Sequence, residues 1–461
     1  MIRQKKYFLI PFLGLLCSVA FSQTDSIITL KQALQLAIKN YPLLQAKEYE
    51  VKAADEELKA TRRGYLPALG VSGQLSYATD NSLPGTYFPM GIVPSTSAGI
   101  SAKENTEAAF GSIALGYFEW TPIRFGKYRA KINESKAELI YANADDANEL
   151  FTDQVNVAGA YFKLLALQKI VETDQKNIFR AEEIKHIIAS YATNGLKPGV
   201  DTSFANSEIS KAKINFLNDE QISETQKNTL ANLMGIANVN FKLDSVFTQH
   251  IPIVSADTIT TNLGNNPLIQ LYNSEVKISE AQSKYIAKSY FPNISLLGIT
   301  DGRGSGIGYN GIYNNAFSDG TKLSRYNYAL GISCTFNILD YPRIKSETEA
   351  QKFRTKALQS ELSAQNVELK NQLLLSYNTI QSALEEAKEA PIQFSAASDA
   401  YRQKLAMYNS GLTSIADVAQ TLYNLNRAES DQAIANEKVW DALLYIAATK
   451  GDLTILFNNI K

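Results

Sequence analysis

The chain repeats itself, and this duplication constrains its fold more than any other feature of the sequence. When the sequence is shifted by 225 residues, segment 40–73 falls on segment 265–298, and 11 of the 34 aligned positions are identical. Farther along, the shift becomes 216 residues, and both copies there carry a Gly-Leu pair followed after four residues by aspartate. A period this long is not that of a solenoid. The sequence therefore predicts two halves of similar structure, related by pseudosymmetry.

Helices are expected to dominate both halves. After Pro42, apolar residues recur at helical spacing to about Arg63, and Pro267 opens the matching segment of the second half. Very long helical stretches with few breakers follow in each half, and at 1.5 Å per residue each would reach roughly 100 Å. A tight turn leads from each long helix into a return helix. The long and return helices are predicted over residues 129–194, 201–235, 344–409 and 415–449.

A β-hairpin is expected between the first and the long helix of each half. Apolar residues alternate there with small or polar ones, which predicts strands with one apolar face and one small, polar face. Loops rich in glycine, serine and asparagine join the two strands of each hairpin, over residues 79–107 and about 302–325. The strands are predicted over residues 69–77, 111–118, 293–300 and 326–338.

Such a sheet fits either a soluble sandwich or a membrane β-barrel. The strand lengths suit the 9–11 residues of a spanning strand. Aromatic residues lie at the strand ends, as in the girdles at membrane interfaces. These features favour the barrel. The aromatic residues concerned are Tyr65, Tyr77, Trp120, Phe125, Tyr290, Phe291, Tyr326 and Tyr341.

The N-terminus predicts a secretory signal peptide over residues 1–22. A basic start precedes the apolar stretch from Phe8 to Leu16, and Ala20-Phe21-Ser22 fits a cleavage site. A buried first helix is the alternative. Without this segment Cys334 is the only cysteine, so no intrachain disulfide can form. The expected organisation is then a first repeat over 23–240, a linking segment over 241–262, and a second repeat with a C-terminal tail over 263–461.

Composition and motifs give no indication of catalysis or of nucleic acid as a partner. The formal net charge is −1, which gives no electrostatic reason for binding nucleic acid. The two histidines, His186 and His250, are far apart and lack metal-ligand spacing. The sequence contains no G-x-S-x-G or H-E-x-x-H motif. We therefore expect a protein that is not an enzyme and needs no cofactor.

Four strands are too few for a spanning barrel, because the smallest known barrels have eight. An open sheet edge in lipid would leave backbone groups without partners. Several copies of the chain would then have to share one barrel, and three copies would supply twelve strands. The expected fold class is mainly α with a membrane β-barrel part.

The duplicated order of elements resembles that of the TolC-like outer-membrane efflux proteins. The matching residues are the starts at Pro42 and Pro267, the Y-x-P entries to the first strand of each half, and the two Gly-Leu turns. The resemblance covers about residues 24–455. It implies a homotrimer with a twelve-stranded barrel in outer-membrane lipid and an α-helical barrel in the periplasm. Such a trimer is a passive exit duct of a tripartite efflux or type I secretion system, joined to a periplasmic adaptor and an inner-membrane transporter.

The same resemblance assigns roles to the two turns. Gly195, Leu196, Gly411 and Leu412 match the tip where the adaptor docks, and Asp417, Gln420 and Asp201 would lie at the periplasmic aperture. The residues themselves leave simpler roles open. Both glycines suit the end of the incoming helix. Both leucines suit a local cap contact. Both aspartates suit the first turn of the outgoing helix, where a carboxylate complements the helix dipole.

Two other classes of protein compete with the channel. A secreted coiled-coil adhesin or structural stalk would explain the long helices, but it predicts sustained heptads and no alternating strands. A self-contained porin would need many more strands and few helices. The alternation from Tyr326 to Ile338 favours the channel over the stalk.

Overall fold

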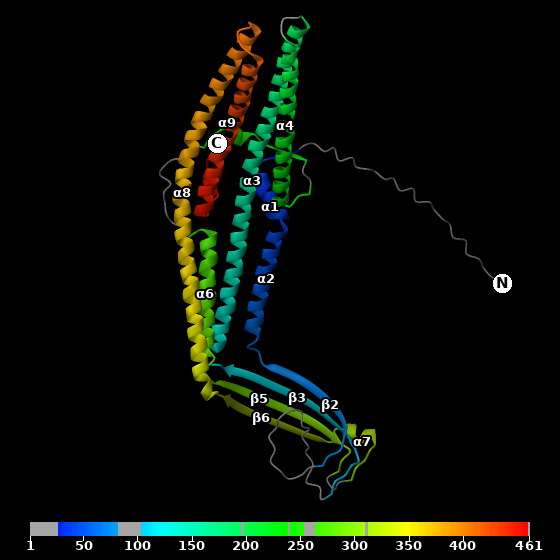
Figure 1. The fold of residues 1–461 in the computed structure, drawn as a ribbon. Helices are drawn as coiled ribbons and strands as arrows, with labels where there is room; N and C mark the ends of the chain where they lie inside the picture. Colours follow the sequence, from blue (N-terminus) through cyan, green and yellow to red (C-terminus); the bar gives the residue numbers. More distant parts are fainter. Residues whose placement is uncertain are drawn as a thin grey trace, which may run out of the picture.

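The computed structural model describes residues 26–81, 103–194, 198–237, 240–252, 263–308 and 312–459. Long helices form an extended body, and a four-stranded sheet lies at one end of it (Figure 1). The expected mainly helical fold with a small β part is confirmed. Within these described residues, no helix is both long and apolar enough to span a membrane. The predicted signal peptide lies outside them.

The two halves contain the same succession of long elements. In each, a helix that begins with proline leads into an antiparallel pair of strands, then into a very long helix and a return helix. The first half contains α1 (Leu30–Asn40), α2 (Pro42–Arg63), β2 (Ala68–Ala78), β3 (Ala109–Ile123), α3 (Lys127–Thr193) and α4 (Gly199–Leu233). The second contains α6 (Pro267–Lys288), β5 (Asn293–Ser305), α7 (Phe317–Thr321), β6 (Arg325–Thr335), a 3-10 turn (Ile338–Asp340), α8 (Tyr341–Asn409), α9 (Ile415–Lys450) and α10 (Thr454–Phe457).

Between the halves, a short segment returns to the start of the chain. Its strand β4 (Phe241–Leu243) pairs in parallel with β1 (Ser26–Ile28) and is followed by α5 (Val246–Gln249). Helix α1, which the sequence patterns did not reveal, begins at a capping box in which Thr29 and Gln32 bond to each other's backbone. Its buried face packs into the main core.

Three strand predictions need correction. The second strand does not end at residue 118 but continues to Ile123, because β5 supplies partners there, with Ile294 opposite Ile123. The third strand does not end at residue 300 but continues to Ser305, because β3 supplies backbone partners along the extension, with Ile113 opposite Arg303. Part of the predicted loop is therefore strand, and α7 occupies another part of it. The fourth strand ends at Thr335 rather than at Ile338, where the chain turns into a 3-10 helix.

The strand order is β2-β3-β5-β6, and every pairing is antiparallel. Residues opposite each other in neighbouring strands share a face. Val71 lies opposite Gly116, so Ile113, Leu115 and Tyr117 of β3 lie on the other face, whereas Phe118, opposite Leu69, shares the face of Val71. The prediction of one small, polar face is therefore wrong at β3, because its Ile113, Leu115 and Tyr117 lie on the face that carries the small and polar residues of β2. The residues on this second face include Ile113, Leu115, Tyr117, Gly70, Ser72, Gln74, Asp301 and Asn327.

The first face of the sheet is apolar and uncovered. Val71 is 90% exposed and Leu330 is 83% exposed, and both lie on it. In the described sheet, β2 and β6 are each hydrogen-bonded along one edge only. A single chain therefore leaves two strand edges and one apolar face without partners.

Aromatic residues gather where the sheet meets the helices. Trp120 donates its indole N–H to the carbonyl oxygen of Tyr65 (2.9 Å), and their rings meet edge to face. Tyr290 contacts the rings of Phe336 and Tyr341 in the same way, in the second half. These contacts fix the direction in which the helical body leaves the sheet.

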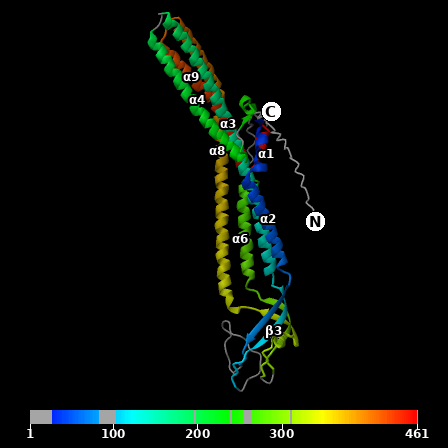
Figure 2. The same cartoon turned by 90° about the vertical axis from the view of Figure 1, so that its right-hand side faces the viewer.

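The helical body has two parts. Near the sheet, α2 and α6 pack beside α3 and α8, and farther away α4 and α9 take their place. Figure 2 shows that the far part is tilted relative to the near part. The main core lies between these parts, where Tyr161, Phe162, Phe247 and Trp440 pack together.

Candidate functional site

The candidate site lies at the end of the helical body opposite the sheet (Figure 1). The end of α3 and the start of α4 lie there, at the same end of the molecule as the turn from α8 into α9. Of the predicted tip residues, Gly195 and Leu196 lie outside the described residues. Gly411 and Leu412 form the described turn.

The turn after α8 is a Schellman motif. Gly411 has a positive φ of 74° and donates its N–H to the carbonyl oxygen of Tyr408 (3.0 Å). Leu412 donates its N–H to the carbonyl oxygen of Met407 (2.8 Å). In this motif the residue after the glycine often packs on the last helical turn. Here the Leu412 side chain is 72% exposed instead, so it projects from the tip.

Asp417 belongs to the capping box of α9. Its carboxylate Oδ2 accepts hydrogen bonds from the Thr413 hydroxyl (2.5 Å) and from the Ser414 N–H (3.3 Å). Its own N–H donates to the Ser414 hydroxyl oxygen (3.3 Å). These bonds, the one from Thr413 first, hold the pKa of Asp417 below its ordinary value. The carboxylate is exposed to solvent and ionised at neutral pH. Asp417 can therefore cap α9 and also present a negative charge at the tip.

Gln420 and Asp201 have different surroundings from Asp417. Gln420 is exposed one turn farther along α9 and donates to the Asn424 side-chain oxygen (3.1 Å). Asp201 lies in the first turn of α4 and accepts a hydrogen bond from the Tyr408 hydroxyl (3.3 Å). Asp201, in the hairpin of α3 and α4, is therefore hydrogen-bonded to the hairpin of α8 and α9. Asp417 and Gln420 both lie on α9.

Tyr408 joins the two hairpins at the tip. It comes from α8, is only 1% exposed and bonds to the start of α4. Burial, and then the nearby charge of Asp201, raise the pKa of Tyr408 to about 12. Around it lies a second apolar core built from all four long helices, made of Ala181, Ile184, Ile188, Ala205, Ile209, Tyr408, Ile415, Val418 and Leu422.

Three residues of the site were not predicted from the sequence as members of it: Tyr408, Thr413 and Ser414. A signal for Ser414 was present, because serine followed three residues later by an acid is typical of a helix start. A weaker one existed for Tyr408, since a tyrosine precedes both Gly-Leu turns. Nothing local indicated that Tyr408 would reach Asp201, 207 positions away.

Comparison with protein families decides the identity of the chain. The model of the family described as "Outer membrane efflux protein" matches residues 33–236 and 258–451, which is most of the sequence. The chain belongs to this family. The resemblance to TolC-like proteins seen in the sequence is confirmed, and the efflux protein is placed in the outer membrane with its helical body extending from it.

Solved structures of similar fold support this assignment. The outer-membrane channel OprN is 16% identical with a TM-score of 0.74, over 92% of this chain and 89% of OprN. The outer membrane protein VceC of Vibrio cholerae is 15% identical with a TM-score of 0.73, over 92% and 96% of the two chains. The CmeC channel of Campylobacter jejuni is 14% identical with a TM-score of 0.74, over 98% and 93%. Comparison with curated proteins finds no match.

OprN and CmeC are outer-membrane channels, and the efflux protein shares the fold of all three structures along nearly its whole length. In the part of the chain that the structure describes, no three histidine, cysteine, aspartate or glutamate residues are grouped so as to hold a metal ion. The family and the fold together support a duct for efflux across the outer membrane.

Proposed function

We propose that three copies of the efflux protein form one passive exit duct. The observation that carries this proposal is the sheet, with two free edges and an uncovered apolar face in the single chain. Unpaired backbone groups in lipid cost several kcal/mol each. If β6 of one copy pairs with β2 of the next, three copies close a twelve-stranded barrel and no edge remains.

In this barrel the face with Val71 and Leu330 contacts lipid, and the other face lines the lumen. The lumenal face carries Asp301, which accepts hydrogen bonds from Arg303 (2.8 Å) and Asn327 (3.1 Å). Polar groups that bond to one another in this way suit a wall in contact with water. The chain divides as two repeats, 23–240 and 263–461, joined by the segment 241–262.

The far end of the helical body is then the periplasmic end of the duct. Three copies of Asp417 would surround the mouth with exposed negative charge, which favours cations. Gln420 and Asp201 lie near the same mouth. The exposed Leu412, together with Gly411 and with Gly195 and Leu196 of the other turn, is proposed to meet a periplasmic adaptor. That adaptor would connect the duct to an inner-membrane transporter, in a tripartite efflux or type I secretion system.

Bilayer conductance can separate the two roles of Asp417. Asp417→Asn keeps an oxygen that can accept from the Ser414 N–H but removes the charge. Ser414→Ala keeps the charge but removes one bond of the capping box. We expect Asp417→Asn to lower the preference of the pore for cations, with unfolding little changed. We expect Ser414→Ala to leave selectivity unchanged and to destabilise α9 by about 1 kcal/mol. Unchanged selectivity in Asp417→Asn would remove Asp417 from the pore.

The shared barrel is tested by native mass spectrometry of the mature chain in mild detergent. We expect the mass of three copies. As a comparison, Asn327→Pro removes one backbone donor from β6, because proline cannot donate to the strand ladder, and it also removes the side-chain bond to Asp301. This variant should lose the trimer. A stable monomer of the unchanged chain in the absence of detergent would contradict the barrel and favour a soluble stalk.

A further inference from the structure

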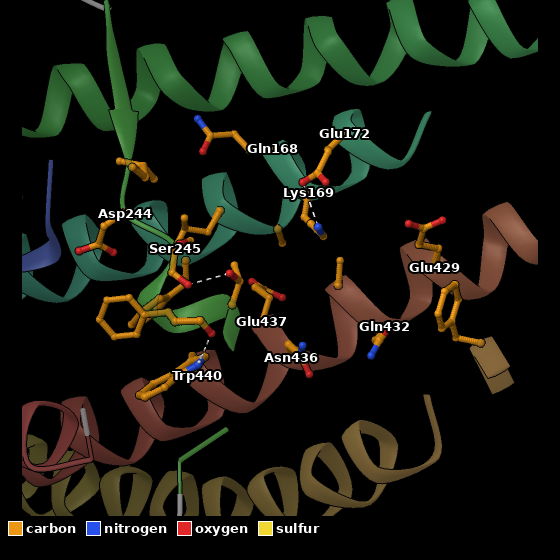
Figure 3. Close-up of a pocket in the computed structure, with 18 residues that line it drawn as sticks. Gln168, Lys169, Glu172, Asp244, Ser245, Glu429, Gln432, Asn436, Glu437 and Trp440 are labelled. Atoms are coloured by element: carbon orange, nitrogen blue, oxygen red, sulfur yellow. Dashed lines mark hydrogen bonds and ion pairs between the residues drawn. The ribbon is translucent and has the colours of Figure 1, made fainter. Parts of the chain in front are cut away.

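A pocket of about 540 Å³ opens in the middle of the helical body (Figure 3). Its walls come from α3, from α9, from the segment that contains β4 and α5, and from Phe394 of α8. This volume lies within the usual range for sites that hold small molecules. The pocket is far along the body from the tip, and none of the proposed aperture or docking residues lines it.

Aromatic rings form one wall of the pocket. Phe162, Phe247 and Trp440 line it, and each of them is at least 95% buried. The rings of Phe162 and Trp440 stack at 5.8 Å, and Phe247 meets Trp440 edge to face at 4.9 Å. Trp440 donates its indole N–H to the carbonyl oxygens of Phe247 (2.9 Å) and His250 (3.2 Å). This wall is fixed in place before any ligand arrives.

The charges at one end of the pocket are already balanced. Glu172 pairs with Lys169 and Lys176, both at 2.9 Å. Glu429 pairs with Arg180 (3.0 Å) and with Lys176 (3.4 Å). Figure 3 shows Lys169, Glu172 and Glu429 toward the end of the pocket that is farther from Trp440. A charged ligand would find little uncompensated charge at this end.

The end near Trp440 is different, because the structure shows no close ion pair for its carboxylates among the described residues. Asp244 accepts a hydrogen bond from the Tyr161 hydroxyl (2.9 Å), and Glu437 lines the same pocket. The charges of Lys163 and Lys438 act on Glu437 more weakly than its burial and the charge of Asp441 do. Burial, and then the charge of Asp441, raise the pKa of Glu437 above its ordinary value. A positive charge placed here would relieve both effects.

We propose that this pocket binds a lipophilic organic cation, with its apolar body against Phe162, Phe247 and Trp440 and its positive charge at Glu437. Aromatic faces attract cations, and most strongly where water is excluded. An anion of the same shape would be repelled by Asp244 and Glu437. A neutral molecule would do nothing to offset the cost of keeping the Glu437 carboxylate charged in a partly buried position. Because α3 and α9 belong to different halves of the chain, the bound cation would bridge the two halves.

Tryptophan fluorescence gives a direct test, because the chain has only two tryptophans, Trp120 and Trp440. In a Trp120→Phe background, Trp440 reports on the pocket alone. The purified channel in mild detergent is titrated with tetraphenylphosphonium and, separately, with tetraphenylborate, which has the same shape and the opposite charge. We expect saturable quenching or a spectral shift with the cation and none with the anion.

The role of Glu437 is tested in the same background. Glu437→Gln should weaken binding of tetraphenylphosphonium by about tenfold, as expected for the loss of one partly buried charge. Glu385→Gln, at an exposed glutamate that pairs with Lys388 on α8 outside the pocket, should leave binding unchanged. Ala433→Phe should abolish the saturable response by filling the pocket from α9, without any change of charge.

Three results would overturn the proposal. One is an equal response of Trp440 to the two ions, which would indicate partition into detergent. Another is equal affinity of Glu437→Gln and Glu385→Gln for the cation. The third is a saturable response that persists in Ala433→Phe, which would place the bound cation elsewhere. All three readouts are independent of conductance, so they do not depend on the proposed pore.

Discussion

Replacing Asp153 by asparagine should make the helical body more stable above about pH 6. Asp153 lies on α3 and is only 2% exposed, and among the described residues neither of its carboxylate oxygens has a hydrogen-bond partner. Burial, and then the charge of Glu149, raise the pKa of Asp153 to about 6 from an ordinary value of 3.8. The folded chain therefore keeps a proton on Asp153 that the unfolded chain has already released.

The size and sign of the effect follow from proton linkage. A pKa difference of about 2 pH units corresponds to about 3 kcal/mol at 1.36 kcal/mol per unit. Below about pH 4 the side chain is protonated in both states and the penalty is absent. The penalty grows as the pH rises from about 4 to about 6, and it is fully present above that. Asp153→Asn never ionises, so it should be more stable than the unchanged chain by up to about 3 kcal/mol near pH 8.

Thermal unfolding followed by far-UV circular dichroism in mild detergent can measure this from about pH 4 to about pH 8. We expect the two melting curves to be close at the acid end and to separate as the pH rises, with Asp153→Asn melting at the higher temperature. Asp399→Asn is the matched control, because Asp399 is exposed and pairs with Arg402. A difference between Asp153→Asn and the unchanged chain that stays constant with pH, or a lower melting temperature near pH 8, would refute the reasoning.

Three further predictions concern backbone strain, the tip and the sheet. Gly411 and Gly451 have nearly the same φ, 74° and 71°, but an added Cβ meets nothing within 4 Å at Gly411 and lies 2.6 Å from the Asn266 backbone at Gly451. Gly411→Ala should cost about 1 kcal/mol and Gly451→Ala clearly more in thermal unfolding, and equal losses would contradict this. Tyr408→Phe removes the hydrogen bond to Asp201 and should lower the local stability of the tip by about 1 kcal/mol. Amide hydrogen exchange at the start of α4 should then become faster. Unchanged exchange there would show that this bond does not stabilise the tip. Cys334 lies on the apolar face of the sheet, so a fluorescent dye attached to it should be quenched by lipid that carries a quencher. A dye on Ser333→Cys in a Cys334→Ser background should not be quenched, because residue 333 lies on the other face. Equal quenching of the two dyes would contradict the assignment of the faces.

Much of the fold could be predicted because its signals are local. Helix α2 runs from Pro42 to Arg63 as expected, since its proline start and its apolar spacing act within a few turns. The two long helices begin within three residues of the predicted positions and end within one. The turn at Gly411 was also readable, because a positive φ at the end of a helix selects glycine.

The candidate site was predicted in part for the same reason. Asp417 was expected in the first turn of α9, and it lies there, within a capping box that Ser414 completes. Tyr408 could not be predicted as the partner of Asp201, because that bond depends on how two hairpins pack side by side. The pocket at Trp440 could not be predicted either, since its walls come from segments near residues 165, 245, 394 and 435.

The sequence by itself determined the duplication, the order of helices and strands and the chemistry of the turns, because periodicity and capping act over a few residues. Tertiary structure alone decided which faces and which distant residues meet. Alternation within β3 showed that Ile113, Leu115 and Tyr117 share a face, but only the register with β2 placed them opposite the face of Val71. A shift of one residue between strands exchanges the two faces, and that shift is chosen by pairing across the whole sheet.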